Sequence, residues 1–304
     1  MLFEELPKSL DKCRFVSKGA TRWVFEAAPG IAIKYFVRGR LDEFQVENEI
    51  YDLIERNHPP PLFIRSFLRL PGLNFMQLMA DNLDARLQRN QRRDFEKHVC
   101  LEVLRLEPTP KIEQWAAELS AALAWLESLG LVQGDLRPTN LLLDSDDHLK
   151  LADFDSSCKI GAENLGLAPP WSRVLGKEGG QLYGTFGLCG AQSEQFAFGS
   201  ILYNLTRGFE PYEDKGVEAV SLWQNMVLPQ LSDSRLDALT LCCWKGDFAT
   251  LADLAKAVAV LEGAKRAATA IASEEGGYMS KMKGYCEKLL QENFADLDVG
   301  TPAN

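Results

Sequence analysis

Short apolar runs and one helical pattern alternate over the first 80 residues. Runs rich in aromatic and β-branched side chains predict strands at residues 14–16, 23–26, 31–36, 63–70 and 73–79. Pro29-Gly30 lies between two of these runs and favours a hairpin there. Helical spacing in residues 44–56 involves the apolar side chains Phe44, Val46, Ile50, Leu53 and Ile54. The pattern predicts a small sheet with one main helix.

Helical patterns dominate beyond residue 80. Residues 111–129 repeat apolar side chains with a 3.6-residue period, and Gly130 supplies a stop signal. Another helix is indicated around residues 196–205, where apolar side chains cover most sides and therefore predict burial. Residues 155–190 show little periodicity and contain several glycines. A stretch of that length without regular structure is uncommon in a folded domain, so we expect it to be functional.

The composition is that of an acidic globular protein. The 304 residues carry a net charge of −10, with 46% hydrophobic and 25% charged residues, which excludes disordered and disulfide-scaffold classes. The acidity argues against nucleic-acid binding, and no apolar run reaches the ~18 residues of a membrane span. We expect no signal peptide, because the start is acidic and lacks an apolar region. The seven cysteines show no CxxC spacing and favour reduced thiols in the cytoplasm or the nucleus.

One segment combines the residue types of phosphoryl transfer. The string D-L-R-P-T-N at residues 135–140 precedes a short apolar strand, a turn and D-F-D at residues 153–155. A carboxylate such as Asp135 orients a hydroxyl and accepts its proton. The amide oxygen of Asn140 and the carboxylate of Asp153 are hard oxygen ligands for Mg²⁺. The alternative is that these side chains only cap turns.

This combined string resembles the catalytic and magnesium-binding loops of protein kinases. The resemblance covers about residues 12–263, because segments before and after the string follow the family in order. It implies an α+β, bilobal protein-kinase-like fold, in which a small β-rich N-lobe holds one main helix and the larger C-lobe is mostly helical. We expect the N-lobe at residues 1–79, the C-lobe at residues 80–263 and a helical tail at residues 264–304.

The resemblance also implies roles for individual residues. Lys34 is similar to the strand lysine that pairs with the α/β-phosphates of ATP, and Glu49 to the helix glutamate that holds it, with Glu47 as the competing position. Arg137 would direct a cation toward the γ-phosphate. Further nucleotide contacts are expected from Ser17, Gly19, Val24, Met76 as gatekeeper, and the backbone of Gln77 to Met79.

The sequence departs from the family pattern at several positions. Gly19 alone remains of three loop glycines, which let a backbone approach phosphates closely. Gln133-Gly134 replaces the His-Arg pair before the catalytic Asp, so no cation is present to bind a phosphorylated activation segment. Glu194 stands where the family has Asp, and the Ala-Pro-Glu anchor is absent.

The function implied by the resemblance is that of an ATP- and Mg²⁺-dependent phosphotransferase acting on a Ser/Thr hydroxyl of a protein substrate. A pseudokinase acting as a scaffold or decoy is the first alternative, motivated by the degenerate glycine loop. A small-molecule kinase is the second, because Gly134-Asp135 before an Asn is also similar to aminoglycoside and choline phosphotransferases. Neither a nucleic acid nor a membrane is an expected partner.

Residues 264–304 lie outside the resemblance. From Tyr278 to Phe294, apolar side chains recur every three or four positions with lysines between them, which predicts an amphipathic helix. We expect this helix to dock on the large lobe and complete its core. The alternative is a partner-binding helix, with residues 267–277 as its tether.

Overall fold

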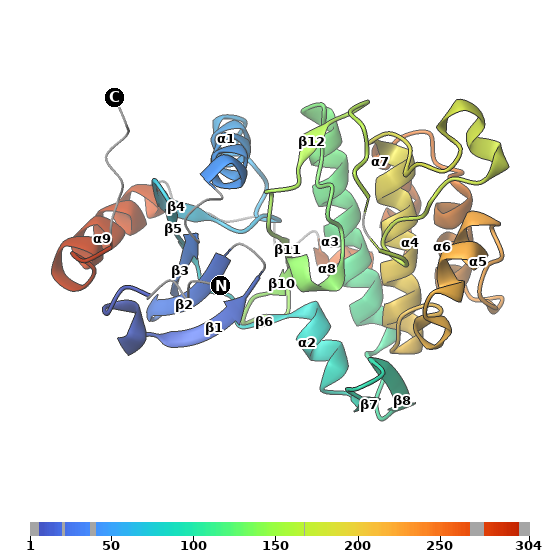
Figure 1. Cartoon of the computed structure of the whole chain (residues 1–304), viewed down its shortest axis with the longest axis horizontal. Helices are drawn as coiled ribbons and strands as arrows, with labels where there is room; N and C mark the ends of the chain where they lie inside the picture. Colours follow the sequence, from blue (N-terminus) through green and yellow to red (C-terminus); the bar gives the residue numbers. More distant parts are fainter. Residues whose placement is uncertain (1–5, 20–21, 37–40, 167, 268–276, 298–304) are drawn as a thin grey trace. The chain divides into compact units, whose positions relative to one another are not determined.

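The chain forms two units in the computed structural model (Figure 1). The structure describes residues 6–19, 22–36, 41–166, 168–267 and 277–297. Unit 1 comprises Met1–His58, Ile64–Met79 and Ala272–Asn304, and unit 2 comprises Pro59–Phe63 and Ala80–Ile271. The end of the chain therefore groups with its beginning rather than forming a separate tail. Among the described residues, no helix is long and apolar enough to cross a membrane.

Unit 1 is built on an antiparallel five-stranded sheet in the order β1-β2-β3-β5-β4. Its strands are β1 (Arg14–Lys18), β2 (Arg22–Ala28), β3 (Ile31–Phe36), β4 (Ser66–Leu70) and β5 (Leu73–Gln77). Gly30 has a φ of 79° in the turn between β2 and β3, a conformation that glycine adopts without strain. The central strand β3 is buried except for Tyr35, so it carries Lys34 into an apolar interior.

Helix α1 (Leu41–Arg56) turns one face towards the interior of unit 1. Phe44, Glu47, Tyr51 and Ile54 are buried along it at three- and four-residue spacing. Val46, which the sequence pattern assigned to the apolar stripe, is 39% exposed. The inward face of α1 thus includes a glutamate.

Helix α9 (Tyr278–Asn293) completes the core of unit 1 and lies beside β4 (Figure 1). The cluster that it joins draws on both ends of the chain: Leu10, Phe25, Ile33, Phe75, Cys286, Leu289, Phe294 and Leu297. The amphipathic helix was predicted correctly. Its expected docking on the large lobe was wrong, because its apolar side chains are buried against the sheet of unit 1. Most of the expected tether, residues 267–277, lies outside the described residues.

Unit 2 is mostly helical. Its helices are α2 (Leu83–Gln88), α3 (Thr109–Ser128), α4 (Ala191–Arg207), α5 (Glu218–Gln224), α6 (Arg235–Lys245), α7 (Leu251–Ala259) and α8 (Ala264–Ala267). Helix α3 packs against α4, α7 and α8, and α4 packs against α6 (Figure 1). The crossing of α4 and α6 needs Gly199, because a Cβ there would lie 2.9 Å from the Cβ of Cys243. A β-rich part and a larger helical part are therefore observed, as expected, but unit 1 contains two long helices, α1 and α9, where one main helix was expected.

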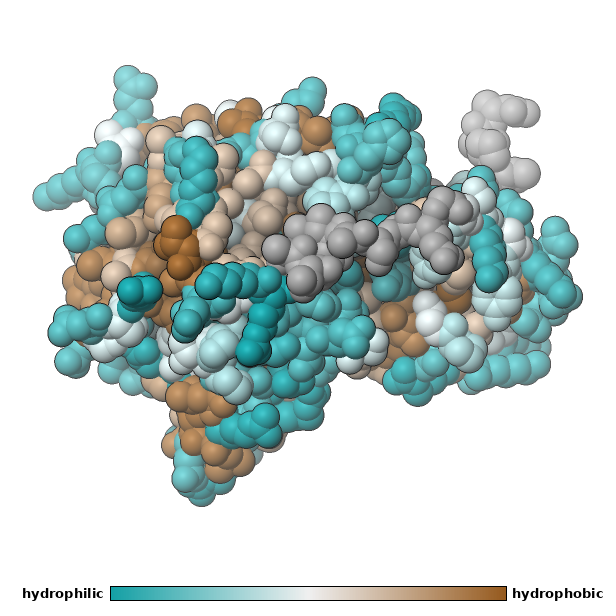
Figure 2. All heavy atoms as spheres, turned by 180° about the vertical axis from the view of Figure 1, so that it is seen from behind, coloured by the Kyte–Doolittle hydropathy of each residue, from teal (hydrophilic) through white to brown (hydrophobic). Residues whose placement is uncertain are grey.

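Short strands in unit 2 position its loops. They are β6 (Asp81–Asn82), β7 (Gln91–Asp94), β8 (Val99–Val103), β9 (Leu131–Val132), β10 (Leu141–Leu143), β11 (Leu149–Leu151) and β12 (Cys158–Lys159). The β7–β8 hairpin, which the sequence pattern did not predict, forms the lower projection in Figure 2. It carries the exposed apolar side chains Phe95, Leu101 and Leu104.

Candidate active site

The loop around Asp135 is held by a neighbouring amide. Gln133 is fully buried, and its Oε1 accepts a hydrogen bond from the Asp135 N–H at 2.7 Å. Its Nε2 donates to the carbonyl oxygen of Asp153 at 2.8 Å. One side chain thus ties the backbone at both carboxylates. The sequence pattern identified Gln133 only as a replacement for the histidine of the family pattern. An amide side chain, which both donates and accepts hydrogen bonds, is nevertheless suited to bridging two backbone segments.

The two carboxylate oxygens of Asp135 have different surroundings. Oδ2 accepts from Nδ2 of Asn140 at 2.9 Å and lies 3.0 Å from Nη2 of Arg137. Oδ1 is buried and has no hydrogen-bond partner among the described residues. Burial raises the pKa of Asp135, whereas the positive charge of Arg137 and the hydrogen bond from Asn140 act to lower that pKa. A buried acceptor without a donor is a favourable place for a substrate hydroxyl.

Asn140 and Asp153 flank the β10–β11 hairpin, which brings them together. The Ala152 N–H donates to the carbonyl oxygen of Asn140 at 3.0 Å. The Nδ2 of Asn140 donates to both the carbonyl oxygen and Oδ2 of Asp135, which orients the amide oxygen away from that residue. Asp153 has a φ of 66°, a conformation that non-glycine residues adopt rarely and often at functional sites.

An amide oxygen and a carboxylate at the mouth of one hairpin suit Mg²⁺, which prefers hard oxygen ligands and keeps several waters. No cluster of three or more His, Cys, Asp or Glu side chains that could hold a metal occurs among the described residues. The candidate ligands here are one amide and one carboxylate, so the donor set fits Mg²⁺ rather than a zinc centre.

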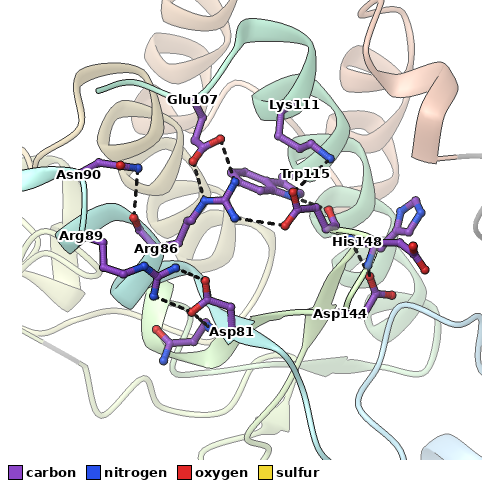
Figure 3. Close-up of polar contacts among 12 residues, drawn as sticks. Asp81, Arg86, Arg89, Asn90, Glu107, Lys111, Trp115, Asp144 and His148 are labelled. Carbon is purple, nitrogen blue, oxygen red and sulfur yellow. Dashed lines mark hydrogen bonds and ion pairs between the residues drawn. The ribbon is translucent and has the colours of Figure 1, made fainter. Parts of the chain in front are cut away.

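The far end of the same hairpin is anchored to helices α2 and α3 (Figure 3). His148 Nδ1 lies 2.6 Å from Oε1 of the buried Glu118 on α3. Arg86 on α2 lies 2.7 Å from Glu107 and 3.2 Å from Asp147 in the turn of the hairpin. The turn is thereby fixed to two helices, which stabilises the hairpin that carries both candidate metal ligands.

Glu194, at the start of α4, holds the backbone before Asp135. Its two carboxylate oxygens accept from the N–H groups of Gln133 and Gly134, each at 3.2 Å. Burial raises the pKa of Glu194 to about 7 against these hydrogen bonds. Gly134 is required there, because its φ is 81° and a Cβ would lie 2.2 Å from the carbonyl oxygen of Ser156. The sequence identified Glu194 as a replacement but did not predict these two contacts.

Residues 158–189 fold back on themselves, although the sequence pattern predicts little structure there. The Gly161 N–H donates to the carbonyl oxygen of Cys189 at 2.8 Å, and the Cys189 N–H donates to that of Ala162 at 2.8 Å. Further along, the Leu175 N–H donates to the carbonyl oxygen of Thr185 at 2.8 Å. A cavity of about 330 Å³ lies between this segment and the adjoining ends of α4 and α6.

In unit 1, Lys34 pairs with Glu47 and not with Glu49. Its Nζ lies 2.5 Å from Oε1 of Glu47, and the two side chains are 5% and 0% exposed. Glu49 is exposed and accepts from Nε2 of Gln45. Two positions along a helix rotate a side chain by about 200°, so only one of the two glutamates can lie on the inward face. The assignment of Glu49 is therefore corrected to Glu47.

Besides Lys34 on β3, the residues expected to contact a nucleotide lie on β1 and directly after it, on β2, and on β5 and directly after it. Ser17 pairs with Val24 across β1 and β2, and Val24 pairs with Lys34 across β2 and β3. The Gly19 N–H donates to the carbonyl oxygen of Arg22 at 2.8 Å, and residues 20–21 between them lie outside the described residues.

The expected hinge begins at the end of β5. Met76 is 7% exposed and pairs with Ala32 and Ser66 on the neighbouring strands. The Gln77 N–H donates to the carbonyl oxygen of Arg65 at 2.9 Å, so this donor is used within unit 1. Met79 is half-buried. Whether these residues bind adenine stays a prediction.

Comparison with known proteins agrees with the geometry of unit 2. A family model described as the protein kinase domain matches residues 75–235, and the chain belongs to this family. The α+β, bilobal kinase-like fold inferred from the sequence is thereby confirmed.

Two mammalian protein kinases illustrate the likeness. Serine/threonine-protein kinase Sgk1 of Rattus norvegicus is 39% identical over 160 residues, which cover 47% of this chain and 32% of that protein. Rho-associated protein kinase 1 of Homo sapiens is 31% identical over 148 residues, which cover 43% of this chain and 11% of that protein. The match thus spans a third or less of either relative.

Proposed function

We propose that the chain transfers the γ-phosphoryl group of ATP, with Mg²⁺, to a Ser or Thr hydroxyl of a protein. The observation that carries this proposal is the orphaned Oδ1 of Asp135 beside Arg137 and Asn140. Membership of the protein kinase domain family and the likeness to a serine/threonine-protein kinase support it. We further propose that the protein works in the cytoplasm, which fits its seven free cysteines.

Asp135 would orient the attacking hydroxyl and accept its proton as the phosphorus–oxygen bond forms. Burial raises the pKa of Asp135, which strengthens the carboxylate as a proton acceptor. Arg137 would keep this carboxylate ionised and present a cation to the transferring group. Lys34, held by Glu47, would bind the α/β-phosphates. Mg²⁺, when bound by Asn140 and Asp153, would neutralise charge on the phosphate oxygens.

The test is a transfer assay with radiolabelled ATP and Mg²⁺ on Ser/Thr peptides, Tyr peptides, choline and an aminoglycoside. Wild type is expected to label Ser/Thr peptides, and Asp135→Asn to lower turnover by about 10²–10⁴-fold, because its neutral amide cannot accept the proton. Asp146→Asn is the matched control, because Asp146 is an exposed carboxylate on the turn of the β10–β11 hairpin. Equal turnover of wild type and Asp135→Asn would contradict the mechanism.

A pseudokinase is the second candidate, because Gly19 is the one glycine left in the expected phosphate-binding loop. No transfer to any acceptor by a folded protein, together with unchanged melting in ATP and Mg²⁺, would favour it. Labelling of choline or the aminoglycoside but of no peptide would instead indicate a small-molecule kinase.

A further inference from the structure

Two thiols meet at the base of the segment that precedes α4. Cys158 lies on β12, where it pairs with Val132 of β9, and Cys189 lies just before α4. Their Sγ atoms are 2.7 Å apart, and the Sγ–H of Cys189 also points to the carbonyl oxygen of Glu163. Both are free thiols. The sequence gives no hint of this contact, because the two residues are 31 positions apart.

The backbone on both sides of this pair is already fixed. Gly161 and Ala162, which follow Cys158, exchange hydrogen bonds with the backbone of Cys189, each at 2.8 Å. Glu163 and Leu188 continue this pairing as an antiparallel bridge. A disulfide needs close, well-oriented side chains and otherwise requires backbone movement. Here the backbone pairing of residues 161–163 with residues 188–189 already holds the two segments together. We therefore expect a bond between the two sulfurs to require only side-chain adjustment.

Other cysteines of the chain lack such an arrangement. Cys242 and Cys243 are neighbours on helix α6, where adjacent side chains do not face each other. Cys286 is buried in the core of unit 1, and Cys13 contacts the carbonyl oxygen of Ser9. Cys100 is a half-buried thiol on β8. The contact between Cys158 and Cys189 is therefore specific to the segment.

We propose that Cys158 and Cys189 form an oxidative modification site, which a peroxide or a low-molecular-weight disulfide converts into an intrachain disulfide. With a peroxide, Cys158, the more exposed thiol, is oxidised to a sulfenic acid and one water is released. The sulfur of Cys189 then attacks the sulfenic sulfur, and the displaced hydroxide leaves with the Cys189 proton as a second water. With a low-molecular-weight disulfide, two exchange steps form the same bond and release two small thiols.

The surroundings predict slow formation and a lasting product. Burial raises the pKa of Cys158 to about 12 and also raises that of Cys189, and the negative charge of Glu194 acts in the same direction. The thiolate fraction at neutral pH is therefore small, which slows oxidation. Thiols of high pKa are also poor leaving groups, so a reductant cleaves their disulfide slowly.

The bond would join the two ends of residues 158–189 beside the active-site loop. Cys158 is paired through β12 to β9, which leads directly into that loop. If the chain is a protein kinase in function, oxidation beside the loop of Asp135 is expected to change the rate of peptide phosphorylation. That consequence rests on the proposed function, whereas formation of the bond does not.

The experiment treats the full chain with hydrogen peroxide or with oxidised glutathione, blocks the remaining thiols with an alkylating reagent and digests with trypsin. Each of the peptides 151–159 and 178–207 contains a single cysteine. We expect these two peptides to be joined by a reducible bond, in a monomeric chain that has lost two hydrogens. This pairing is expected to exceed every other cysteine pairing in yield.

Variants make the outcome decisive. Cys100→Ser is the matched control and is expected to form the same linkage as wild type. Cys189→Ser is expected to abolish the linkage and leave Cys158 as a sulfenic acid or as a mixed disulfide with glutathione. Complete alkylation of both thiols in oxidant-treated wild type, or linkage only between chains, would overturn the proposal. Neither result depends on phosphotransfer, so failure of the proposed function is seen separately in the transfer assay.

Discussion

The candidate site residues of unit 2 and of unit 1 are positioned in different ways. In unit 2, Asp135, Asn140 and Asp153 belong to one loop and one hairpin, and hydrogen bonds within residues 133–153 hold them. In unit 1, Lys34 and Glu47 come from a strand and a helix, so their contact depends on the face that the helix turns inward. The spacing of residues within one loop can be recognised in a sequence. Which face of a helix turns inward is instead decided by its packing against the rest of the unit.

The units also differ in the stretch of chain that builds their cores. Unit 2 uses Pro59–Phe63 and Ala80–Ile271, which are almost continuous. Unit 1 buries Leu10 together with Phe294 and Leu297 from the other end of the chain. The stability of unit 1 is therefore expected to depend on α9 far more than its position in the sequence suggests.

The largest expected effect tests this dependence. Phe294→Ala removes a ring that is 3% exposed and lies 6.2 Å from the ring of Phe75, between centroids. Such a truncation costs about 3–5 kcal/mol of unfolding free energy, so the melting temperature should fall by several degrees. Calorimetry is the measurement. Lys288→Ala, which removes an exposed ion pair with Glu292, serves as the control and should change little. Equal melting of Phe294→Ala and wild type would contradict the contribution of the residue that follows α9 to this core.

The second-largest expected effect tests which of the two glutamates of α1 acts together with Lys34. Glu47→Gln removes the negative charge 2.5 Å from Lys34, so peptide phosphorylation should fall by roughly tenfold or more. Glu49→Gln changes an exposed carboxylate on the opposite face and should leave turnover unchanged. Steady-state assays of the two variants, with circular dichroism to verify folding, decide between the two glutamates. A loss confined to Glu49→Gln would restore the original assignment.

Much of the local structure was predictable because single elements follow short-range patterns. The helix expected at residues 111–129 is observed as Thr109–Ser128, and the strand at residues 31–36 is observed as Ile31–Phe36. The proximity of Asp135 and Asn140 in the candidate site was predictable for the same reason, since the two residues are hydrogen-bonded within one loop.

Other features depend on contacts between distant residues, which the sequence pattern does not show. Glu47 and Glu49 are chemically identical, and they differ only in that Glu47 lies on the buried face of α1 that also carries Phe44 and Tyr51. The apolar face of α9 was recognised, but nothing in its periodicity specified which surface it covers. Gln133 was overlooked because its two hydrogen bonds are visible only after β11 returns Asp153 to it.

A smaller expected effect is a pH dependence of the unfolding free energy, which arises from Glu194 beside the Asp135 loop of unit 2. The pKa of Glu194 is about 7 in the folded protein and near 4.5 when unperturbed. Between these values the folded state retains a proton that the unfolded state has lost, so this group lowers the unfolding free energy as pH rises from about 4.5 to 7. Urea unfolding of Glu194→Gln at several pH values should show a flatter decline than wild type. Parallel profiles for the two proteins would contradict the raised pKa.

The smallest expected effect is that of phosphatase treatment, which we expect to leave the activity nearly unchanged. Gly134 has no side chain with which to bind a phosphate, and its N–H donates to Glu194. Phosphatase treatment should therefore change peptide phosphorylation by less than about twofold. Thr185, which is exposed, and Ser172, which is buried, are sites to monitor by mass spectrometry. A large loss of activity that rephosphorylation restores would show that another residue of the chain responds to the phosphate.

The placement of α9 in the core of unit 1 has a consequence for synthesis on the ribosome. The strands β1 to β5 are translated before most of unit 2, but the residues that cover them, up to Leu297, are translated after it. Nearly all of unit 2, Ala80–Ile271, is translated in between and can fold first. Unit 1, whose strands are made first, is thus the later of the two units to finish folding, and a nascent chain halted before Tyr278 would carry a complete unit 2 and a sheet that still exposes apolar side chains.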